Sequence, residues 1–262
     1  MHKIDGAGHV NGQFVSEDAV TGRAPTLVTA EWLNAVQEEL VALVEAAGLT
    51  LDKTNPAQVL QAIQLRKSLC AVFTASGSFT VPAGVYRLHV RLVGGGGAGG
   101  GATGTSFGSG GGAGGYAEGW ANVIPGQVIP VTVGSAGIGV LGENGGGGGT
   151  SSFGTFGSAT GGYGGVTMSV TAPTSPGAGG FGGYGAWDSA PFVISGGGYG
   201  QDCYPETASG MGGASAFGGG GRSSSFSGSD AYAYGAGGGG CYSPGGYWRG
   251  GHGKQGLVIL EY

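Results

Sequence analysis

Residues 85–97 read VYRLHVRLVGGGG, and this stretch decides the fold of most of the chain. Its first nine residues alternate between two kinds of side chain, as expected of an extended strand with one buried face. The apolar set is Tyr86, Leu88, Val90 and Leu92, and the basic or imidazole set is Arg87, His89 and Arg91. A half-buried β-strand is therefore predicted, and the glycines that follow begin a region of different character.

Glycine is concentrated on the C-terminal side of residue 70. Of the 67 glycines in 262 residues, 62 lie in residues 71–262. Collagen needs Gly at every third position, and that strict period fails here because residues 187–195 interrupt it. Disordered chains have few aromatic residues and a high net charge, whereas this chain is 10% aromatic and 10% charged. The composition predicts a folded, mainly β domain with glycine-rich loops.

Further apolar runs predict the partners of the first strand. They are residues 78–81, 116–124, 128–133, 150–153, 166–171, 192–195 and 257–262. The Pro125-Gly126 turn predicts a hairpin between the second and third of these runs. A chain terminus stays ordered only when something pairs with it, so the last run is predicted to lie beside the first strands and to close the domain.

Runs of three to five glycines separate the strands. They are residues 94–97, 99–101, 110–112, 145–149, 196–198, 218–221 and 237–240. Ordering glycine costs more entropy than ordering any other residue. Polyproline-II segments built from glycine can approach closely enough to hydrogen-bond through their backbones. Ordered polyglycine II-like segments are therefore predicted, with flexible turns as the alternative.

Residues 1–70 have a different pattern. Residues 1–28 contain turn signals and little apolar sequence, so a partner is expected to order them. A helix is predicted from the N-cap Thr29 to Gly48, and a second helix from Asn55-Pro56 to about Leu69. Two short helices bury too little surface to stand alone, which favours self-association about an axis. The predicted assembly residues are Trp32, Val36, Leu40, Leu43, Val44 and Ile63.

The charged residues and cysteines exclude several functions. The net charge is −5 and no basic run is present, so nucleic acid is not an expected partner. No apolar run is long enough for membrane insertion, and assembly in the cytoplasm is predicted. Cys70, Cys203 and Cys241 have no metal-ligand spacing; structural thiols are predicted, with a late Cys203–Cys241 disulfide as the alternative.

No catalytic, metal or cofactor site is predicted. The segment GTSFG at residues 104–108 matches the G-x-S-x-G pattern, but no helix follows it. Glycosidases need paired carboxylates, and Asp202 and Glu206 are predicted to be a solvated loop pair. The four histidines have no ligand spacing.

The aromatic residues of the later glycine-rich segments are the predicted receptor contacts. Tyr and Trp provide large, stiff contact surfaces with a polar group. They are Tyr184, Trp187, Tyr199, Tyr204, Tyr232, Tyr234, Tyr242, Tyr247 and Trp248, with a subset expected at a distal tip. The alternative is that these rings pack over the glycine segments as their core.

Two stretches of residues 1–70, IDGAGHVNGQF at 4–14 and TAEWLNAVQEEL at 29–40, carry a resemblance. This region resembles the N-terminal region of tail-fibre proteins from tailed phages and prophages, which implies attachment to the baseplate or tail tip and trimeric assembly. The rest, with FTVPAGV at 79–85 and GGYAE at 114–118, is similar to the glycine-rich domains that end many fibres and to adhesins with layered polyglycine II helices. Unlike those adhesins, this chain has its own opening and closing strands, which favours a β-sandwich with polyglycine elements.

The expected organisation has three parts: an attachment segment at 1–28, a helical trimerisation region at 29–70 and a glycine-rich β domain at 71–262. The expected function is that of a non-catalytic phage tail fibre within the virion. Its C-terminal domain would bind a bacterial surface receptor, namely a polysaccharide, a pilus or an outer-membrane protein. The alternative is a purely structural tail-tip or fibre component without direct receptor contact.

Overall fold

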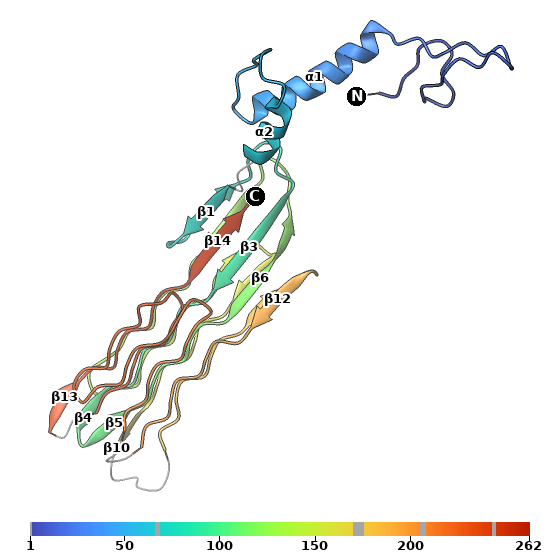
Figure 1. Cartoon of the computed structure of the whole chain (residues 1–262). Coiled ribbons are helices and arrows are strands. Elements are labelled where there is room, and N and C mark those ends of the chain that lie inside the picture. The colour runs from blue at the N-terminus through green and yellow to red at the C-terminus, as the bar shows by residue number, and fades with distance from the viewer. Residues whose placement is uncertain (1, 66–68, 170–175, 205–207, 243–244) are drawn as a thin grey trace. The chain divides into compact units, whose positions relative to one another are not determined.

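The computed structural model describes residues 2–65, 69–169, 176–204, 208–242 and 245–262. The chain divides into two compact units, Met1–Ser68 and Leu69–Tyr262. The first unit holds both helices, and the second holds all of the strands (Figure 1). A mainly β chain with two helices is therefore confirmed.

Helix α1 (Ala30–Ala46) begins and ends where the sequence predicts. The Thr29 hydroxyl accepts a hydrogen bond from the Trp32 N–H, and Gly48 adopts a positive φ of 75° just beyond the helix. Helix α2 (Gln58–Leu65) starts later than predicted, after a turn in which the Asn55 side chain accepts from the Ala57 N–H at 3.0 Å. Its predicted end was wrong, because Leu69 exchanges backbone hydrogen bonds with Tyr262; residues 66–68 lie outside the described residues.

Two five-stranded antiparallel sheets pack face to face in the second unit. The first sheet has the order β1 (Cys70–Phe73), β14 (Leu257–Glu261), β3 (Arg87–Val93), β6 (Tyr116–Asn122) and β12 (Phe192–Ser195). The second has the order β11 (Gly185–Trp187), β9 (Gly157–Ala159), β8 (Ser151–Phe153), β7 (Val128–Thr132) and β2 (Gly77–Thr80). The terminal strand β14 lies between β1 and β3, as predicted.

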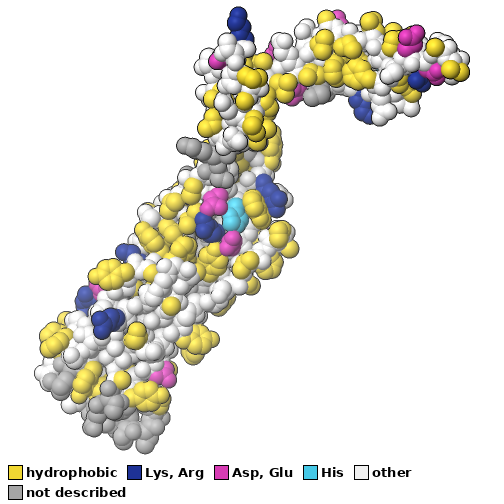
Figure 2. All heavy atoms as spheres, in the orientation of Figure 1, with side chains coloured by type: hydrophobic (Ala, Val, Ile, Leu, Met, Phe, Trp, Pro, Cys, Tyr) yellow, Lys and Arg dark blue, Asp and Glu magenta, His cyan; other side chains and the backbone are white. Residues whose placement is uncertain are grey.

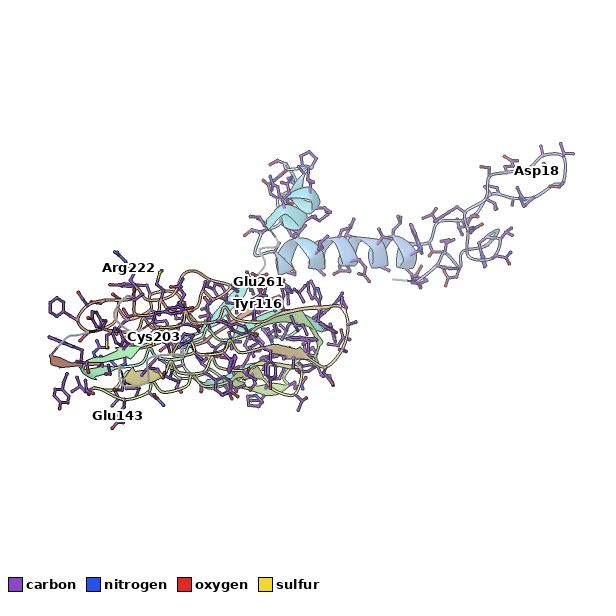
Figure 3. All side chains as sticks on the ribbon, turned by 90° about the horizontal axis from the view of Figure 1, so that it is seen from below. Asp18, Tyr116, Glu143, Cys203, Arg222 and Glu261 are labelled. Carbon is purple, nitrogen blue, oxygen red and sulfur yellow. The ribbon has the colours of Figure 1, made fainter. Side chains whose placement is uncertain are left out.

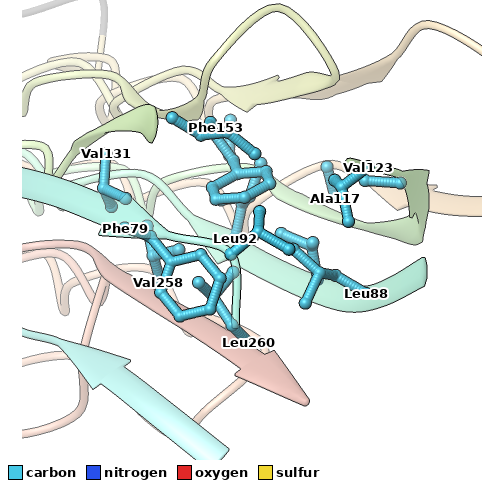
Figure 4. Close-up of a cluster of buried hydrophobic side chains, with 14 residues drawn as sticks. Phe79, Leu88, Leu92, Ala117, Val123, Val131, Phe153, Val258 and Leu260 are labelled. Carbon is cyan, nitrogen blue, oxygen red and sulfur yellow. The ribbon is translucent and has the colours of Figure 1, made fainter. Parts of the chain in front are cut away.

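The hydrophobic core lies between these sheets (Figure 4). Leu88, Val90 and Leu92 of β3 are fully buried, which confirms the alternation of that strand. Phe79, Val131 and Phe153 face them from the second sheet. Tyr86 departs from the pattern because it precedes β3 and is exposed.

The predicted hairpin between residues 116–124 and 128–133 was wrong. β6 pairs with β3 and β12, whereas β7 pairs with β2 and β8. Because β6 and β7 belong to different sheets, the turn between them carries the chain from one sheet to the other. Within this turn the Gln127 N–H donates to the Ile124 carbonyl. Strand β10 (Thr167–Ser169) lies within the predicted run 166–171, of which residues 170 and 171 are outside the described residues.

Glycine segments continue the strands away from the sandwich (Figure 1). The backbone N–H groups of residues 94–101 donate to three neighbouring segments in rotation, at N···O distances of 2.8–3.0 Å, so every third N–H reaches the same segment. In order, these acceptor segments are residues 109–115, 143–149 and 251–254. The carbonyls of residues 94–101 accept from Gly137 and from residues 162–165 and 238–241, so this segment is hydrogen-bonded on all sides.

Residues 109–115 repeat the arrangement, donating in turn to residues 160–166, 198–201 and 235–238. Three bonds join the innermost segments in a ring, because Gly97 donates to Gly112, Gly111 to Gly238, and Gly238 back to Gly97. We call the glycine array the three central segments 94–101, 109–115 and 235–241 together with the outer segments bonded to them. The outer segments are residues 134–140, 143–149, 160–166, 177–183, 196–201, 208–214, 219–229 and 250–256.

The end of the array remote from the sandwich carries two short ribbons (Figure 1). One pairs β4 (Ala102–Gly104) with β13 (Gly246–Trp248), and the other pairs β5 (Ser106–Gly108) with β10. We call this region the distal end. Because the central segments lead directly into β4 and β5, the backbone of the array fixes the position of these ribbons.

Candidate functional site

Aromatic residues gather at the distal end. Tyr247 and Trp248 lie on β13, opposite Thr103 and Ala102 of β4. The Phe226 ring meets the Trp248 ring edge to face at 5.2 Å between centroids. Tyr247 is 72% exposed and Phe226 is 61% exposed, so both rings present apolar surface to solvent, Tyr247 from a paired strand and Phe226 from a bend beside it.

A second aromatic pair lies at the base of this region. The Tyr242 ring stacks on the buried Phe107 of β5 at 4.5 Å, with an interplanar angle of 5°. Tyr242 also borders a surface hollow of about 270 Å³ whose other lining residues are small. They are Ala208, Ser209, Ser223, Ser224 and Ser225. Hydroxyl groups beside aromatic rings suit a polar, uncharged ligand.

An ion pair secures the chain that follows β13. Arg249 donates from both terminal nitrogens to the Asp230 carboxylate, at 2.7 and 3.3 Å. The His252 N–H donates to the same carboxylate at 2.8 Å. Burial acts to raise the pKa of Asp230, but the hydrogen bonds from Arg249 and His252 outweigh it and hold that pKa below its ordinary value.

The structure separates the nine predicted receptor contacts into different regions. Tyr204, Tyr242, Tyr247 and Trp248 belong to the distal loops and ribbons. Tyr199 lies on an outer segment of the array and Tyr184 directly follows another; they are 70% and 65% exposed. Tyr232 and Tyr234 precede Gly235, which lies against Val93 at the sandwich end of the array.

Trp187 lies in the sandwich and packs against its core. A Cβ atom on Gly119 of β6 would lie 2.3 Å from the Trp187 ring, and one on Gly157 of β9 would lie 2.2 Å from it. Glycine at these two positions therefore makes room for the ring between strands of both sheets. This placement corresponds to the packing alternative rather than to surface contact.

Sequence reasoning missed four aromatic residues: Phe107, Tyr163, Phe181 and Phe226. Tyr163 and Phe181 are more than 60% exposed, and their ring centroids lie 6.4 Å apart in an edge-to-face contact. The missed signal is a spacing of three, since Phe181 and Tyr184 are three residues apart in the sequence GGFGGY. In a segment with three residues per turn, that spacing puts side chains on one face.

A network of charged side chains covers part of the outer face of the first sheet (Figure 2). His89 contacts Glu118 through Nε2 at 2.9 Å and Glu261 through Nδ1 at 3.1 Å. Arg91 also pairs with Glu261, and the Tyr116 hydroxyl donates to Glu118 at 2.5 Å. Burial and the Glu118 hydrogen bond raise the pKa of Tyr116, and the His89 hydrogen bond lowers that of Glu261. Figure 3 labels Tyr116 and Glu261 in this region.

The network makes the stability of the sandwich sensitive to acid. Because the folded pKa of Glu261 lies below its ordinary value of 4.5, its contribution is present above that pH and is lost as pH falls through the lowered value. We expect Glu261→Gln to reduce the dependence of unfolding free energy on pH in urea titrations between about pH 5 and 3. Glu143→Gln, at an exposed position, is the control; an unchanged slope for Glu261→Gln would contradict this assignment.

The cysteines have unequal environments. All three are free thiols; Cys203 and Cys241 are fully buried, whereas Cys70 on the edge strand β1 is exposed. The prediction of structural thiols therefore fits Cys203 and Cys241 but not Cys70. Burial raises the pKa of Cys203, and it raises that of Cys241 to about 11, so neither forms a thiolate readily.

We expect one of the three thiols, Cys70, to react with iodoacetamide at pH 8 in the native protein. All three should react in denaturant, and mass spectrometry counts the labels. Rapid native labelling of Cys203 or Cys241 would show that the distal half of the array opens readily.

Within the described residues, no group of three or more His, Cys, Asp and Glu side chains is placed to hold a metal ion. Over the same part of the chain, no helix is long and apolar enough to cross a membrane. The predicted solvated pair is only partly testable, because Glu206 is outside the described residues; Asp202 accepts from the Gly179 N–H at 2.8 Å.

These features define a glycine-rich β-sandwich protein whose strands extend into a backbone-bonded array with aromatic residues on its surface. The glycine-rich domain family matches residues 74–262, and the chain belongs to that family. Comparison with curated proteins gave no match.

Proposed function

We propose that this protein is a phage tail fibre that binds a host surface receptor through its distal end and has no catalytic role. The observation that carries the proposal is the exposed aromatic surface of Tyr247, on a ribbon that the glycine array holds in place, and of Phe226, which packs against Trp248 of that ribbon. Recognition usually lies on loops supported by a rigid scaffold. The resemblance of residues 1–70 to tail-fibre N-termini supports attachment of this N-terminal region to the baseplate or tail tip.

We further propose that the array segments are polyglycine II helices. A repeat of three residues per turn is the property that distinguishes this conformation from an α-helix or a strand. The period of three in the N–H donors of residues 94–101 and 109–115 supports this assignment. Such helices, hydrogen-bonded on all sides, would form a stiff support that contains few side chains.

The proposal includes a homotrimer assembled through the first unit. Of the predicted assembly residues, Val44 is buried, Trp32, Val36 and Leu43 are half-buried, and Leu40 and Ile63 are 47% and 57% exposed. A hollow of about 230 Å³ between α1 and α2 is lined by Leu40, Val41 and Val59 among others. Apolar side chains of neighbouring copies would cover these surfaces.

A structural component without receptor contact is the second candidate. The observation in its favour is β12, an edge strand whose four residues are all exposed and which pairs only with β6 in its sheet. Exposed apolar edge strands are ready to pair with another chain. In this case the sandwich would bind neighbouring virion proteins, and the distal end would have no partner.

Adsorption of particles that carry variant fibres tests the first candidate against the second. We expect Tyr247→Ala combined with Phe226→Ala to leave assembly intact and to lower the adsorption rate to host cells by about tenfold or more, since avidity multiplies a loss at each copy. Tyr232→Ala is the matched control, because Tyr232 is 93% exposed but lies away from the distal ribbons. Normal adsorption of the double variant would contradict receptor binding by the distal end.

A further inference from the structure

Three exposed rings form a row across the side of the glycine array. Tyr163, Phe181 and Tyr199 come from the outer segments 160–166, 177–183 and 196–201 and are 63%, 62% and 70% exposed. Tyr163 and Phe181 meet edge to face at 6.4 Å, and Phe181 and Tyr199 meet edge to face at 5.7 Å. We call these residues the lateral aromatic row.

The backbone holds the row in place. Tyr163 donates its N–H to the Phe181 carbonyl at 2.9 Å, and its own carbonyl accepts from Gly112 of a central segment at 2.8 Å. Gly180 and Gly200, next to the other two rings, donate to Gly110 and Gly180 respectively. Binding would therefore not have to order these segments, which removes a large part of the usual entropic cost.

A hollow of about 300 Å³ adjoins the row at Tyr163. Tyr163 and Tyr184 supply its aromatic side chains, Thr150 supplies a hydroxyl group, and the hydroxyl of Thr160 bonds to the Tyr184 backbone. The floor is formed by Gly147, Gly148, Gly161 and Gly162. A Cβ atom on Gly147 would meet nothing closer than the Gly162 carbonyl oxygen at 3.6 Å, so there is room at position 147 for a side chain.

Among the described residues, no charged side chain lines this hollow, and the row itself consists of aromatic residues. Anionic ligands would find no cation there, and a cationic ligand would find no carboxylate. Aromatic faces beside hydroxyl groups suit a ligand with apolar ring faces and many hydroxyls. The volume is at the lower end of the range for small-molecule sites, about 300–1,000 Å³, which suits one or two sugar rings.

We propose that the lateral aromatic row and its hollow bind a linear, uncharged glycan chain. One sugar unit occupies the hollow against Tyr163 and Tyr184, and the chain continues over Phe181 toward Tyr199. The site is separate from the distal end, and it does not depend on the assignment of the protein as a tail fibre. It gives the side of the array a binding function in addition to its support of the distal ribbons.

A glycan array with neutral gluco-, galacto- and mannopyranose oligosaccharides tests the proposal, with uronic-acid and sialylated oligosaccharides alongside. The full-length protein should bind at least one neutral oligosaccharide and should not prefer the acidic ones. Titration calorimetry with that oligosaccharide should show a loss of about tenfold or more in affinity for Tyr163→Ala. Gly147→Leu should cause a similar loss by filling the hollow without touching the backbone of the array.

Tyr232→Ala serves as the control, because Tyr232 is exposed and does not belong to the row. It should bind the oligosaccharide as the original protein does. The proposal fails if no neutral oligosaccharide binds, if acidic ones are preferred, or if Tyr163→Ala and Gly147→Leu bind normally. Loss of binding in Tyr247→Ala alone would assign the glycan to the distal end and would also overturn the lateral site.

Discussion

Replacing Gly111 by alanine is expected to lower the free energy of unfolding of the second unit by about 3 kcal/mol, because the added methyl group overpacks the array. Gly111 lies in a central segment of the array, where a Cβ atom would be 2.3 Å from the Gly97 carbonyl oxygen and 2.5 Å from that of Ala98. The obstructing atoms belong to a hydrogen-bonded backbone, so no side chain can turn away to make room. Urea unfolding followed by circular dichroism measures the loss.

Gly147→Ala is the matched control for this experiment. It places the same methyl group on an outer segment, where the nearest atom lies 3.6 Å away, so the unfolding free energy should change by less than about 1 kcal/mol. Equal effects of the two substitutions would mean that the central segments are not close-packed. Ala98, Ala113 and Ala236 are fully buried, so the array accepts methyl groups only at particular positions.

Phe153→Ala is expected to destabilise the sandwich by about 3–5 kcal/mol. Phe153 is fully buried on β8, and its ring lies 6.5 Å from the Phe79 ring and 5.8 Å from the Phe156 ring (Figure 4). Truncation removes apolar contacts and leaves a cavity between two sheets whose backbones cannot close it. Thermal and urea unfolding should both detect the loss.

Phe192→Ala provides the comparison for Phe153→Ala. Phe192 lies on the exposed edge strand β12 and is 44% exposed, so its truncation should cost less than half as much. If Phe153→Ala were as mild as Phe192→Ala, the packing of the two sheets against each other would be contradicted.

The strands were predictable where local alternation decides them. β3 has a single apolar face, and burial of Leu88, Val90 and Leu92 follows directly from its pattern. Strand pairing was less predictable, because alternation identifies a strand and its buried face but not its neighbour. The Pro125-Gly126 turn is compatible with both a hairpin and a crossover, and only packing of the core selects the crossover.

The connectivity of the array could not be read from the glycine runs. A run of glycines has no side chains to mark a neighbour, and the bond partners are far apart in sequence, as for Gly96 and Lys254 or Gly111 and Gly238. The sequence did contain a period of three, in the spacing of aromatic residues. Aromatic residues that interrupt the runs, such as Phe181 and Tyr184, mark the outward face of an outer segment.

The candidate site was predictable in residue type rather than in position. Exposed Tyr residues do occur at the distal end, but Trp187 packs into the sandwich and Tyr199 belongs to the lateral aromatic row. Spacing along the chain does not reveal which segments become outer ones. Which segments become outer ones is decided only when the three central segments pair with their hydrogen-bond partners.

Hydrogen exchange of the glycine amides tests most directly the claim that the array is an ordered, backbone-bonded scaffold. Apart from Ala236, the amides of residues 94–101, 109–115 and 235–241 donate to partners within the array, so NMR should find them protected as strongly as the amides of β3 and β14. Exchange of these amides at the rate of an unstructured chain, while β3 and β14 stay protected, would contradict it.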